Sequence, residues 1–379
     1  MIPLSLPNLA GNEWKYVKKC LDTGWISTAG SFVDRFEVEF AKYLGMKGAV
    51  SVVNGTSALH ISLKLLGVQS DDLIIMPNVT FVASANAISY LGASPLLIDI
   101  DHDSWQMDLD ILENFLSDDC QLNDSNMLVH RETNRKISAL MIVHVQGNLC
   151  DMDRLLAICN NYNLPVIEDA AEALGAKYKG QYAGTLGDIG CFSFNGNKIM
   201  STGGGGMIVS RNSDHLERAK HLTTTAKCNS LTYFHDEVGY NYRLVNVLAA
   251  LGVAQLEQLD DFLASKINTA SYYRANLKDI GDIGFQFVQY GVISNEWLFT
   301  ITTSSMQELL DQLNSNGVMS RPFWIPMNQL PMYSNNLYIN QSDMSARVHR
   351  TALSIPCSTN ILESDLEKVV STIKLFFGG

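Results

Sequence analysis

Residues 187–198, Gly-Asp-Ile-Gly-Cys-Phe-Ser-Phe-Asn-Gly-Asn-Lys, predict a short apolar strand that ends in a polar, glycine-containing loop. Other short apolar runs lie on both sides of this segment, separated by stretches such as 57–66 and 82–91 in which apolar residues recur with helical spacing. This alternation is typical of parallel strands joined by crossover helices. The predicted strands are 49–53, 73–76, 94–98, 139–143, 165–167, 189–193 and 207–210.

The pattern changes after Asn241, where residues 245–263 predict one long amphipathic helix followed by a mixed α/β segment. A chain of 379 residues exceeds the roughly 250 to 300 at which a single core stops growing. We therefore expect a large α/β domain over residues 1–244 and a smaller C-terminal domain over 245–379. Ligands should bind where the parallel strands end.

The composition indicates a well-packed globular protein, with 46% hydrophobic and 17% charged residues. A net charge of −12 disfavours binding to nucleic acid or to an anionic membrane surface. The seven cysteines include no CxxC pair, so we expect reduced thiols and no metal site. No signal peptide or membrane-spanning run is evident, which predicts a cytoplasmic protein.

Asn54-Gly-Thr-Ser-Ala58 follows a predicted strand and opens a predicted helix. Free backbone N–H groups at such a helix start, assisted by the hydroxyls of Thr56 and Ser57, could hold a phosphate. A Ser or Thr that caps the helix without any ligand would look the same. The segment alone therefore leaves both interpretations open.

Pro165-Val-Ile-Glu-Asp-Ala-Ala-Glu172 places Asp169 at the end of a buried strand, where a carboxylate is costly unless it meets a cation. A protonated pyridine nitrogen is one such cation, and an Asp beside it keeps a pyridine cofactor a good electron sink. A helix cap, a metal ligand or a structural salt bridge would also explain Asp169.

Lys198 ends the polar loop that follows strand 189–193. A lysine there could bind a carbonyl cofactor as a Schiff base and then move protons, because a neutral amine is both nucleophile and base. An ordinary surface lysine is the alternative. Thr202-Gly-Gly-Gly-Gly206 follows and lacks the spacing of a dinucleotide-binding motif, so we expect a turn that passes close to a ligand.

Taken in order, these segments resemble the DegT/DnrJ/EryC1/StrS sugar aminotransferases, which are fold-type I enzymes dependent on pyridoxal 5′-phosphate (PLP). The similarity runs through the whole chain. It implies a mixed, mostly parallel seven-stranded sheet flanked by helices, plus the smaller C-terminal domain. The matching stretches are 21–27 (LDTGWIS), 54–59 (NGTSAL), 168–173 (EDAAEA), 187–194 (GDIGCFSF), Lys198 with its glycine run, and 239–244 (GYNYRL).

The resemblance implies a role for each matching residue. Lys198 would be the Schiff-base lysine and Asp169 the partner of the pyridinium nitrogen. The phosphate would be held by Thr56, Ser57 and Ser193, and Phe81 would stack on the cofactor ring. Asn241 would reach the phosphate of a second subunit, which makes the predicted active site a property of a homodimer.

Two positions depart from the pattern of the family. Glu172 stands where many relatives carry Gln near the face or O3′ of the cofactor, and Asn328 stands where many have His. The segments 221–227 (HLTTTAK) and 24–27 (GWIS) are similar to those of LegC-like and bacillosamine-type enzymes. This subgroup implies transfer of the amino group of L-glutamate to C4 of a UDP-linked 4-keto-6-deoxy-N-acetylhexosamine, for surface-glycan synthesis.

An acidic chain that binds a nucleotide diphosphate needs local cations, and Lys227 and Arg243 are the candidates. Both could instead be solvated charges or members of ion pairs. Trp25, Ile26 and Ser27 could line the sugar pocket, although a buried Trp anchor is an equal alternative. His144 also follows a strand, where a lone His is more often structural than catalytic.

Two other functions remain possible from the sequence. One is a related PLP sugar enzyme with another nucleotide, C3 regiochemistry or 3-dehydratase activity. Lys198 argues against the dehydratases that resemble this family, since they replace the lysine by His. The other is a regulatory or binding homologue without catalysis, which would not require both Asp169 and Lys198.

Overall fold

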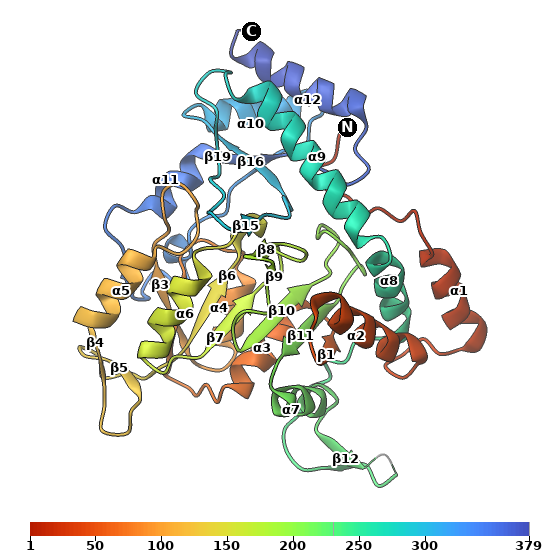
Figure 1. Cartoon of the computed structure of the whole chain (residues 1–379), viewed down its shortest axis with the longest axis vertical. Coiled ribbons are helices and arrows are strands. Elements are labelled where there is room, and N and C mark those ends of the chain that lie inside the picture. The colour runs from red at the N-terminus through yellow and green to blue at the C-terminus, as the bar shows by residue number, and fades with distance from the viewer. Residues whose placement is uncertain (230, 379) are drawn as a thin grey trace.

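The computed structural model describes residues 1–229 and 231–378 and is built around one large β-sheet (Figure 1). The strands of this sheet lie in the order β1-β11-β10-β7-β6-β2-β3-β18. β11 runs antiparallel to both neighbours, and the other pairs are parallel. The bounds are β1 (Ala49–Val52), β2 (Leu73–Pro77), β3 (Ser94–Ile98), β6 (Ile137–Val143), β7 (Val166–Asp169), β10 (Ile189–Ser193), β11 (Gly206–Ser210) and β18 (Tyr338–Ile339).

The α/β class and the mostly parallel sheet are confirmed, and every strand predicted from the sequence is present. The sheet has eight strands where seven were expected, because β18 from the C-terminal part of the chain pairs with β3. Asp169 is the last residue of β7, whereas the prediction ended this strand at residue 167. Its carboxylate still lies at the carboxyl end of the sheet, where ligands bind in such folds.

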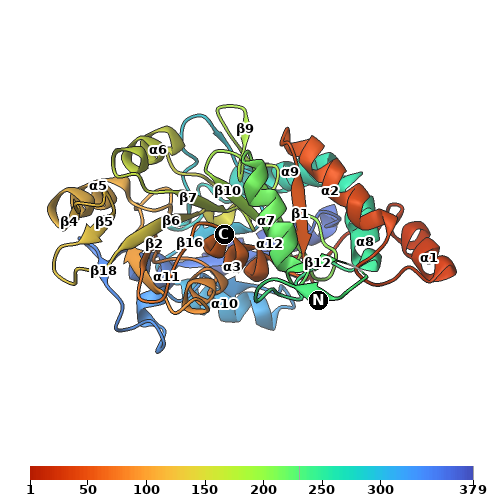
Figure 2. The same cartoon turned by 90° about the horizontal axis from the view of Figure 1, so that it is seen from below.

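Alternate residues of the central strands face two hydrophobic layers, as expected of a sheet covered on both sides. In β2, Leu73 and Ile75 belong to one buried cluster, and Ile74 and Met76 belong to the other. Helices pack on both faces (Figures 1 and 2). The first face is covered by α2 (Ser31–Leu44), α5 (Leu109–Asp118) and α6 (Met152–Asn161), and the second by α3 (Gly55–Leu65), α4 (Ala83–Ser89) and α7 (Ser213–Thr223).

The prediction of a single helix over 245–263 is wrong, because the chain forms α8 (Asn246–Leu256) and then α9 (Leu259–Leu277). Polar contacts to the N-terminal region hold the junction. The Gln258 side-chain amide donates to Glu13 Oε1 at 2.8 Å and to the Ala254 carbonyl at 3.0 Å. The Glu257 carboxylate accepts from Asn12 and Tyr16 at 2.8 and 2.7 Å. Anchored in this way, the chain changes direction between the two helices (Figure 1).

The C-terminal part contains a second sheet, in the order β14-β16-β19-β17, beside helices α10 and α12. The elements here are β14 (Gly284–Phe285), β15 (Val292–Ile293), β16 (Phe299–Thr302), α10 (Met306–Ser315), β17 (Arg321–Pro322), η2 (Met327–Gln329), α11 (Met344–Thr351), β19 (Ala352–Ile355) and α12 (Glu363–Phe376). The remaining elements are α1 (Glu13–Thr23), β4 (Cys120–Leu122), β5 (Leu128–His130), η1 (Val145–Gly147), β8 (Lys177–Tyr178), β9 (Gln181–Tyr182), β12 (Lys227–Asn229) and β13 (Phe234–His235).

Elements after residue 244 contact the first part of the chain at several places, and β15 pairs with β8 there. α8 packs against α1 and α2, and β18 extends the large sheet. The division into residues 1–244 and 245–379 stays a prediction. Among the described residues, none of the helices combines the length and apolar character needed to cross a bilayer.

Candidate active site

A cavity of about 460 Å³ lies at the carboxyl ends of the central strands. Both parts of the chain line it, since β7, β10 and the start of α3 meet residues from the second sheet there. The polar and charged residues of its wall include Thr56, Asp169, Glu172, Ser193, Lys198 and Arg321. Segments far apart in sequence therefore place a lysine, two acids and an arginine around one cavity.

Asp169 presents a buried carboxylate to this cavity, with the residue only 4% exposed. Ser84 Oγ donates to its Oδ2 at 2.7 Å, and the Ala171 N–H donates to its Oδ1 at 3.1 Å. Burial raises the pKa of Asp169, and these two hydrogen bonds oppose that rise. Because a buried carboxylate is costly without a cation, the arrangement favours a positively charged group in front of it.

Lys198 lies in the loop that joins β10 to β11. Its Nζ is 4.0 Å from the centre of the Trp297 ring and 3.9 Å from Glu172 Oε1. The Trp297 indole N–H donates to the Asn197 carbonyl at 2.7 Å, which fixes the ring against this loop. Burial lowers the pKa of Lys198, against the opposing charges of Glu172 and Asp169. A larger share of this amine is therefore neutral and nucleophilic than at an exposed lysine.

Glu172 is the second acid of the cavity and is 3% exposed. Its Oε2 accepts a hydrogen bond from the Gln146 N–H at 2.9 Å, in a turn where Gln146 has a φ of 61°. Burial raises the pKa of Glu172 to about 7, while Lys198 and the Gln146 N–H oppose the rise. Glu172 can therefore gain or lose a proton near neutral pH, next to the lysine amine.

The start of α3 forms the polar end of the cavity. Asn54 caps this helix, since its Oδ1 accepts from the Ser57 N–H at 2.7 Å. Gly55, Thr56 and Ser193 line the space, and a Cβ on Gly55 would come within 2.8 Å of the Ser193 Cβ. The first N–H groups of a helix have no intrahelical acceptor, so this end of the cavity suits an anion. Ser57 is buried and is not among the residues that line the cavity.

Comparison with known proteins identifies the family. The model of the DegT/DnrJ/EryC1/StrS aminotransferase family matches residues 7–374. This chain belongs to that family. It is therefore a sugar aminotransferase whose cofactor is PLP, as the resemblance of its motifs implied.

Relatives in the DegT/DnrJ/EryC1/StrS family differ in the substrates that their names describe. A GDP-perosamine synthase of Escherichia coli O157:H7 is 39% identical, over 88% of this chain and 87% of its own. A UDP-4-amino-4,6-dideoxy-N-acetyl-beta-L-altrosamine transaminase of Campylobacter jejuni is 30% identical, over 98% and 96%. The solved structure of S. venezuelae DesV superposes with a TM-score of 0.87, at 26% identity, over 97% and 95% of the two chains. The LegC-like and bacillosamine-type subgroup is not singled out by these relatives.

The residues of the cavity fit the PLP cofactor of the DegT/DnrJ/EryC1/StrS family. Lys198 has the amine that would hold the cofactor's carbonyl carbon, and the buried Asp169 would supply the anion for its pyridinium nitrogen. The start of α3, with Thr56 and Ser193, offers donors for a phosphate. The close approach of Gly55 to Ser193 leaves no room for a side chain at position 55.

Phe81 lines the cavity and is 56% exposed, so its expected position on the cofactor ring stays a prediction. Asn241 lies outside the cavity of its own chain, opposite Thr224 in an isolated bridge. Trp25, Ile26 and Ser27 are exposed and also lie outside it. All four would need a second subunit to reach an active site, as the resemblance implied for Asn241.

The remaining predicted residues make contacts elsewhere. Arg243 is buried in an ion pair with Glu37, with one N–O distance of 3.2 Å. Lys227 Nζ lies 4.3 Å from the Tyr233 ring centre, outside the cavity. Asn328 exchanges two hydrogen bonds with Asn78, at 2.9 and 3.0 Å. His144 Nε2 donates to the Glu168 carboxylate at 2.8 Å, and His144 lines no part of the cavity.

Sequence reasoning missed Ser84, Trp297 and Arg321. Ser84 lies three residues after Phe81, so the same segment could have suggested it. Arg321 stands just before the Pro326-Met-Asn-Gln segment that drew attention to Asn328. Trp297 lies 99 positions after Lys198, and no local pattern connects the two.

Proposed function

We propose that this aminotransferase moves the amino group of L-glutamate to C4 of a nucleotide-linked 4-keto-6-deoxy sugar. The observation that carries the proposal is Lys198, a buried amine with a lowered pKa that lies beside Glu172 and Trp297 in the same cavity as Asp169. Arg321 supplies a second cation in this cavity. The product would serve the synthesis of a surface glycan.

Lys198 takes and returns the proton in both halves of the reaction. As a neutral amine it removes a proton from the carbon that bears the amino group, and as an ammonium it returns one. PLP, when bound, supplies an electron sink that stabilises negative charge on that carbon. Trp297 restricts where the Lys198 amine can move, because its ring packs on the Nζ and is fixed by Asn197.

Asp169 would supply the negative charge for the pyridinium nitrogen of bound PLP, and Ser84 fixes the orientation of its carboxylate. Glu172 lies 3.9 Å from the Lys198 amine and exchanges a proton near neutral pH. Thr56, Ser193 and the first amides of α3 would hold the phosphate, and Ser57 contributes to the turn that Asn54 caps.

Arg321 is the residue that we assign to the diphosphate of the sugar nucleotide. It is exposed, lines the cavity on β17 and donates to the Ser320 carbonyl at 3.0 Å. Among the described residues it has no carboxylate within ion-pair distance. A guanidinium with unused donors at the wall of an active site is suited to a diphosphate, which it can bind in a bidentate manner.

We propose guanosine as the first nucleotide to test. The GDP-perosamine synthase of E. coli O157:H7 is 39% identical, against 30% for the C. jejuni UDP-sugar transaminase. The UDP-linked N-acetylhexosamine is a second candidate, because residues 24–27 and 221–227 are similar to enzymes that use it. The homodimer is also part of this proposal, since Asn241, Trp25, Ile26 and Ser27 lie outside the cavity of their own chain.

Mass spectrometry of reactions with glutamate and GDP-, UDP- or dTDP-linked 4-keto-6-deoxy sugars tests the function. We expect the amino product with the GDP sugar and at most slow turnover of the others. A product from the UDP-linked N-acetyl sugar alone would assign the second candidate. No product from any sugar, together with no cofactor fixed to Lys198 by borohydride, would overturn the aminotransferase proposal itself.

A further inference from the structure

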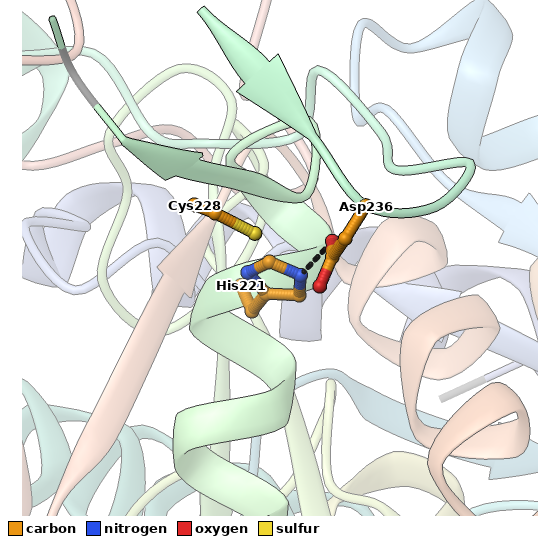
Figure 3. Close-up of side chains that lie close together, drawn as sticks. All are labelled: His221, Cys228 and Asp236. Carbon is orange, nitrogen blue, oxygen red and sulfur yellow. Dashed lines mark hydrogen bonds and ion pairs between the residues drawn. The ribbon is translucent and has the colours of Figure 1, made fainter. Parts of the chain in front are cut away.

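A cluster of three potential metal ligands lies outside the cavity, where α7 meets the β12–β13 hairpin (Figure 3). His221 belongs to the last turn of α7, Cys228 to β12, and Asp236 follows β13. Their ligand atoms, one nitrogen, one sulfur and one oxygen, all lie within 4.8 Å of one another. In Figure 3 the three side chains converge on the space between the helix end and the hairpin.

The backbone between these residues fixes the convergence. Thr225 and Ala226 have φ values of 63° and 51°, which turn the chain sharply after α7. The Ala226 N–H then donates to the His221 carbonyl at 2.9 Å, and the Asp236 N–H donates to the Ala226 carbonyl at 3.4 Å. Two consecutive left-handed residues other than glycine are conformationally costly. The turn that brings the three ligands together is therefore held by its surroundings.

Negative charge surrounds a single imidazole nitrogen in this cluster. His221 Nε2 lies 2.8 Å from Asp236 Oδ1 and 3.5 Å from Glu237 Oε1. One N–H can satisfy only one of these oxygens, and the Cys228 Sγ lies within 4.8 Å of the ligand atoms of both His221 and Asp236. Arg218 forms a two-point ion pair with Glu237, one contact being 2.6 Å, but contacts neither Cys228 nor Asp236 among the described interactions. His221 Nε2 therefore faces two carboxylates, of which Glu237 is already paired with Arg218 and Asp236 is not.

We propose that His221, Cys228 and Asp236 bind a divalent cation of the zinc class, with water or Glu237 in the fourth position. Imidazole nitrogen, thiolate and carboxylate are the ligands that Zn²⁺ accepts in tetrahedral sites. At Zn–ligand distances of about 2.0 to 2.3 Å, the ligand atoms stand roughly 3.3 to 3.8 Å apart, so closure requires movements of about 1 Å. On binding, Cys228 releases its thiol proton and His221 coordinates as the neutral imidazole.

This site would join the hairpin to α7 by bonds stronger than its present contacts. The hairpin lies at the surface, and Leu231, Tyr233 and Phe234 are 87%, 74% and 60% exposed. β12 and β13 pair through only two registered positions, with an irregularity between Lys227 and Asn229. A bound cation would therefore order a segment that has little apolar packing of its own.

Cobalt(II) titration of the full-length PLP-loaded enzyme, stripped of metals by a chelator, tests the proposal directly. We expect one equivalent to give the sulfur-to-cobalt charge-transfer band and the intense visible bands of a tetrahedral site, in spectra taken as a difference from the metal-free enzyme. Zn²⁺ should abolish these bands by competition. No such band at ten equivalents of cobalt would overturn the proposal.

Single-residue variants provide the controls for this titration. Cys228→Ser should remove the charge-transfer band, and His221→Gln should weaken binding by at least about tenfold. His102→Gln is the matched control, because His102 is an exposed histidine beside Asp103 and lies outside the cluster. It should bind cobalt as the wild type does. A band that survives Cys228→Ser would place the metal elsewhere and overturn the assignment.

The thiol supplies an independent measurement. All seven cysteines lie in the described part of the chain, and Cys228 alone is exposed while the other six are buried. One thiol should therefore react with a disulfide reagent before the other six in the native enzyme, and stoichiometric Zn²⁺ should slow that reaction at least tenfold. An unchanged rate with Zn²⁺ would contradict ligation by Cys228.

Discussion

The cavity and the β12–β13 hairpin each place a lysine over an aromatic ring, with different consequences. Lys198 Nζ is 4.0 Å from the Trp297 ring centre, and Lys227 Nζ is 4.3 Å from that of Tyr233. Trp297 is 2% exposed, whereas Tyr233 is 74% exposed. In Figure 1 the hairpin stands away from the main body beside α7. A similar local contact thus lies in a desolvated site in one region and in water in the other.

Burial is therefore what separates a reactive lysine from an ordinary one in this protein. Two acids and an indole surround the Lys198 amine, and desolvation lowers its pKa despite their charge. Electrostatic interactions are strong in such a site and are screened at the surface. The same contrast between buried and exposed positions applies to arginines and acids elsewhere in the chain, and each can be tested with a matched pair of variants.

Replacement of Lys198 should have the largest effect on the transamination rate. Lys198→Ala should lower transamination by at least about 10³-fold, because the covalent anchor and the proton carrier disappear together. Lys227→Ala should change the rate less than twofold. Steady-state rates, borohydride fixation and thermal melts measure activity, attachment and folding separately. Comparable losses in the two variants would remove the distinction between the regions.

The second-largest difference should be between the stability contributions of a buried and an exposed arginine–glutamate pair. Arg243 and Glu37 have side chains 8% and 9% exposed, while Arg218 and Glu237 have side chains 49% and 27% exposed. Arg243→Gln should lower the free energy of unfolding by about 3 to 5 kcal/mol, because the Glu37 carboxylate would remain buried without its partner. Arg218→Gln should cost less than about 1 kcal/mol. Urea unfolding with a chelator present compares the two, and equal losses would contradict the role of burial.

Glu172 predicts a pH dependence of stability in the cofactor-free protein. Burial raises the pKa of its carboxyl to about 7, so the folded state favours the protonated acid. This contribution is complete below the pKa of the unfolded chain and is lost as the pH rises through about 7. From pH 5 to 8 the wild type should lose about 1 to 3 kcal/mol relative to Glu172→Gln.

The exposed Glu308 on α10 provides the control for this measurement. Glu308→Gln should show the same pH profile as the wild type in urea unfolding. A wild-type profile that parallels that of Glu172→Gln would show that the acid is ionised throughout.

The smallest effect concerns Arg321. Arg321→Gln should raise the KM for the nucleotide sugar about tenfold, which corresponds to about 1.4 kcal/mol, without changing the melting temperature. The half-reaction with glutamate alone should stay within twofold of the wild type. Arg347→Gln, at an exposed position on α11, should leave both unchanged. Impairment of the glutamate half-reaction instead would assign Arg321 to the donor's carboxylate.

The strands and the main residues of the cavity were accessible from the sequence because their signals are local. Each buried strand is a continuous apolar run, and Asp169, Ser193 and Lys198 lie at or soon after the end of such a run. β18 has two residues and therefore no periodicity to detect. The break between α8 and α9 depends on Glu13 and Tyr16, which lie more than 200 positions away.

Residues that contribute only through contacts with distant parts of the chain were missed, because no local pattern marks them. Trp297 reaches Lys198 only because the second sheet packs over the cavity. Arg243 was a reasonable candidate for a diphosphate until the structure showed that Glu37 occupies its guanidinium. Which cation is free and which is paired is decided by residues distant in sequence, so charge alone could not select Arg321.

The pairing of β18 with β3 also affects how the protein is made. The β3 edge of the large sheet is completed by residues 338 and 339, so it stays open until these residues have left the ribosome. An open strand edge can pair with other chains, which is a common route to aggregation. Truncation before residue 338 would therefore leave a sheet that is complete in its catalytic residues yet prone to self-association.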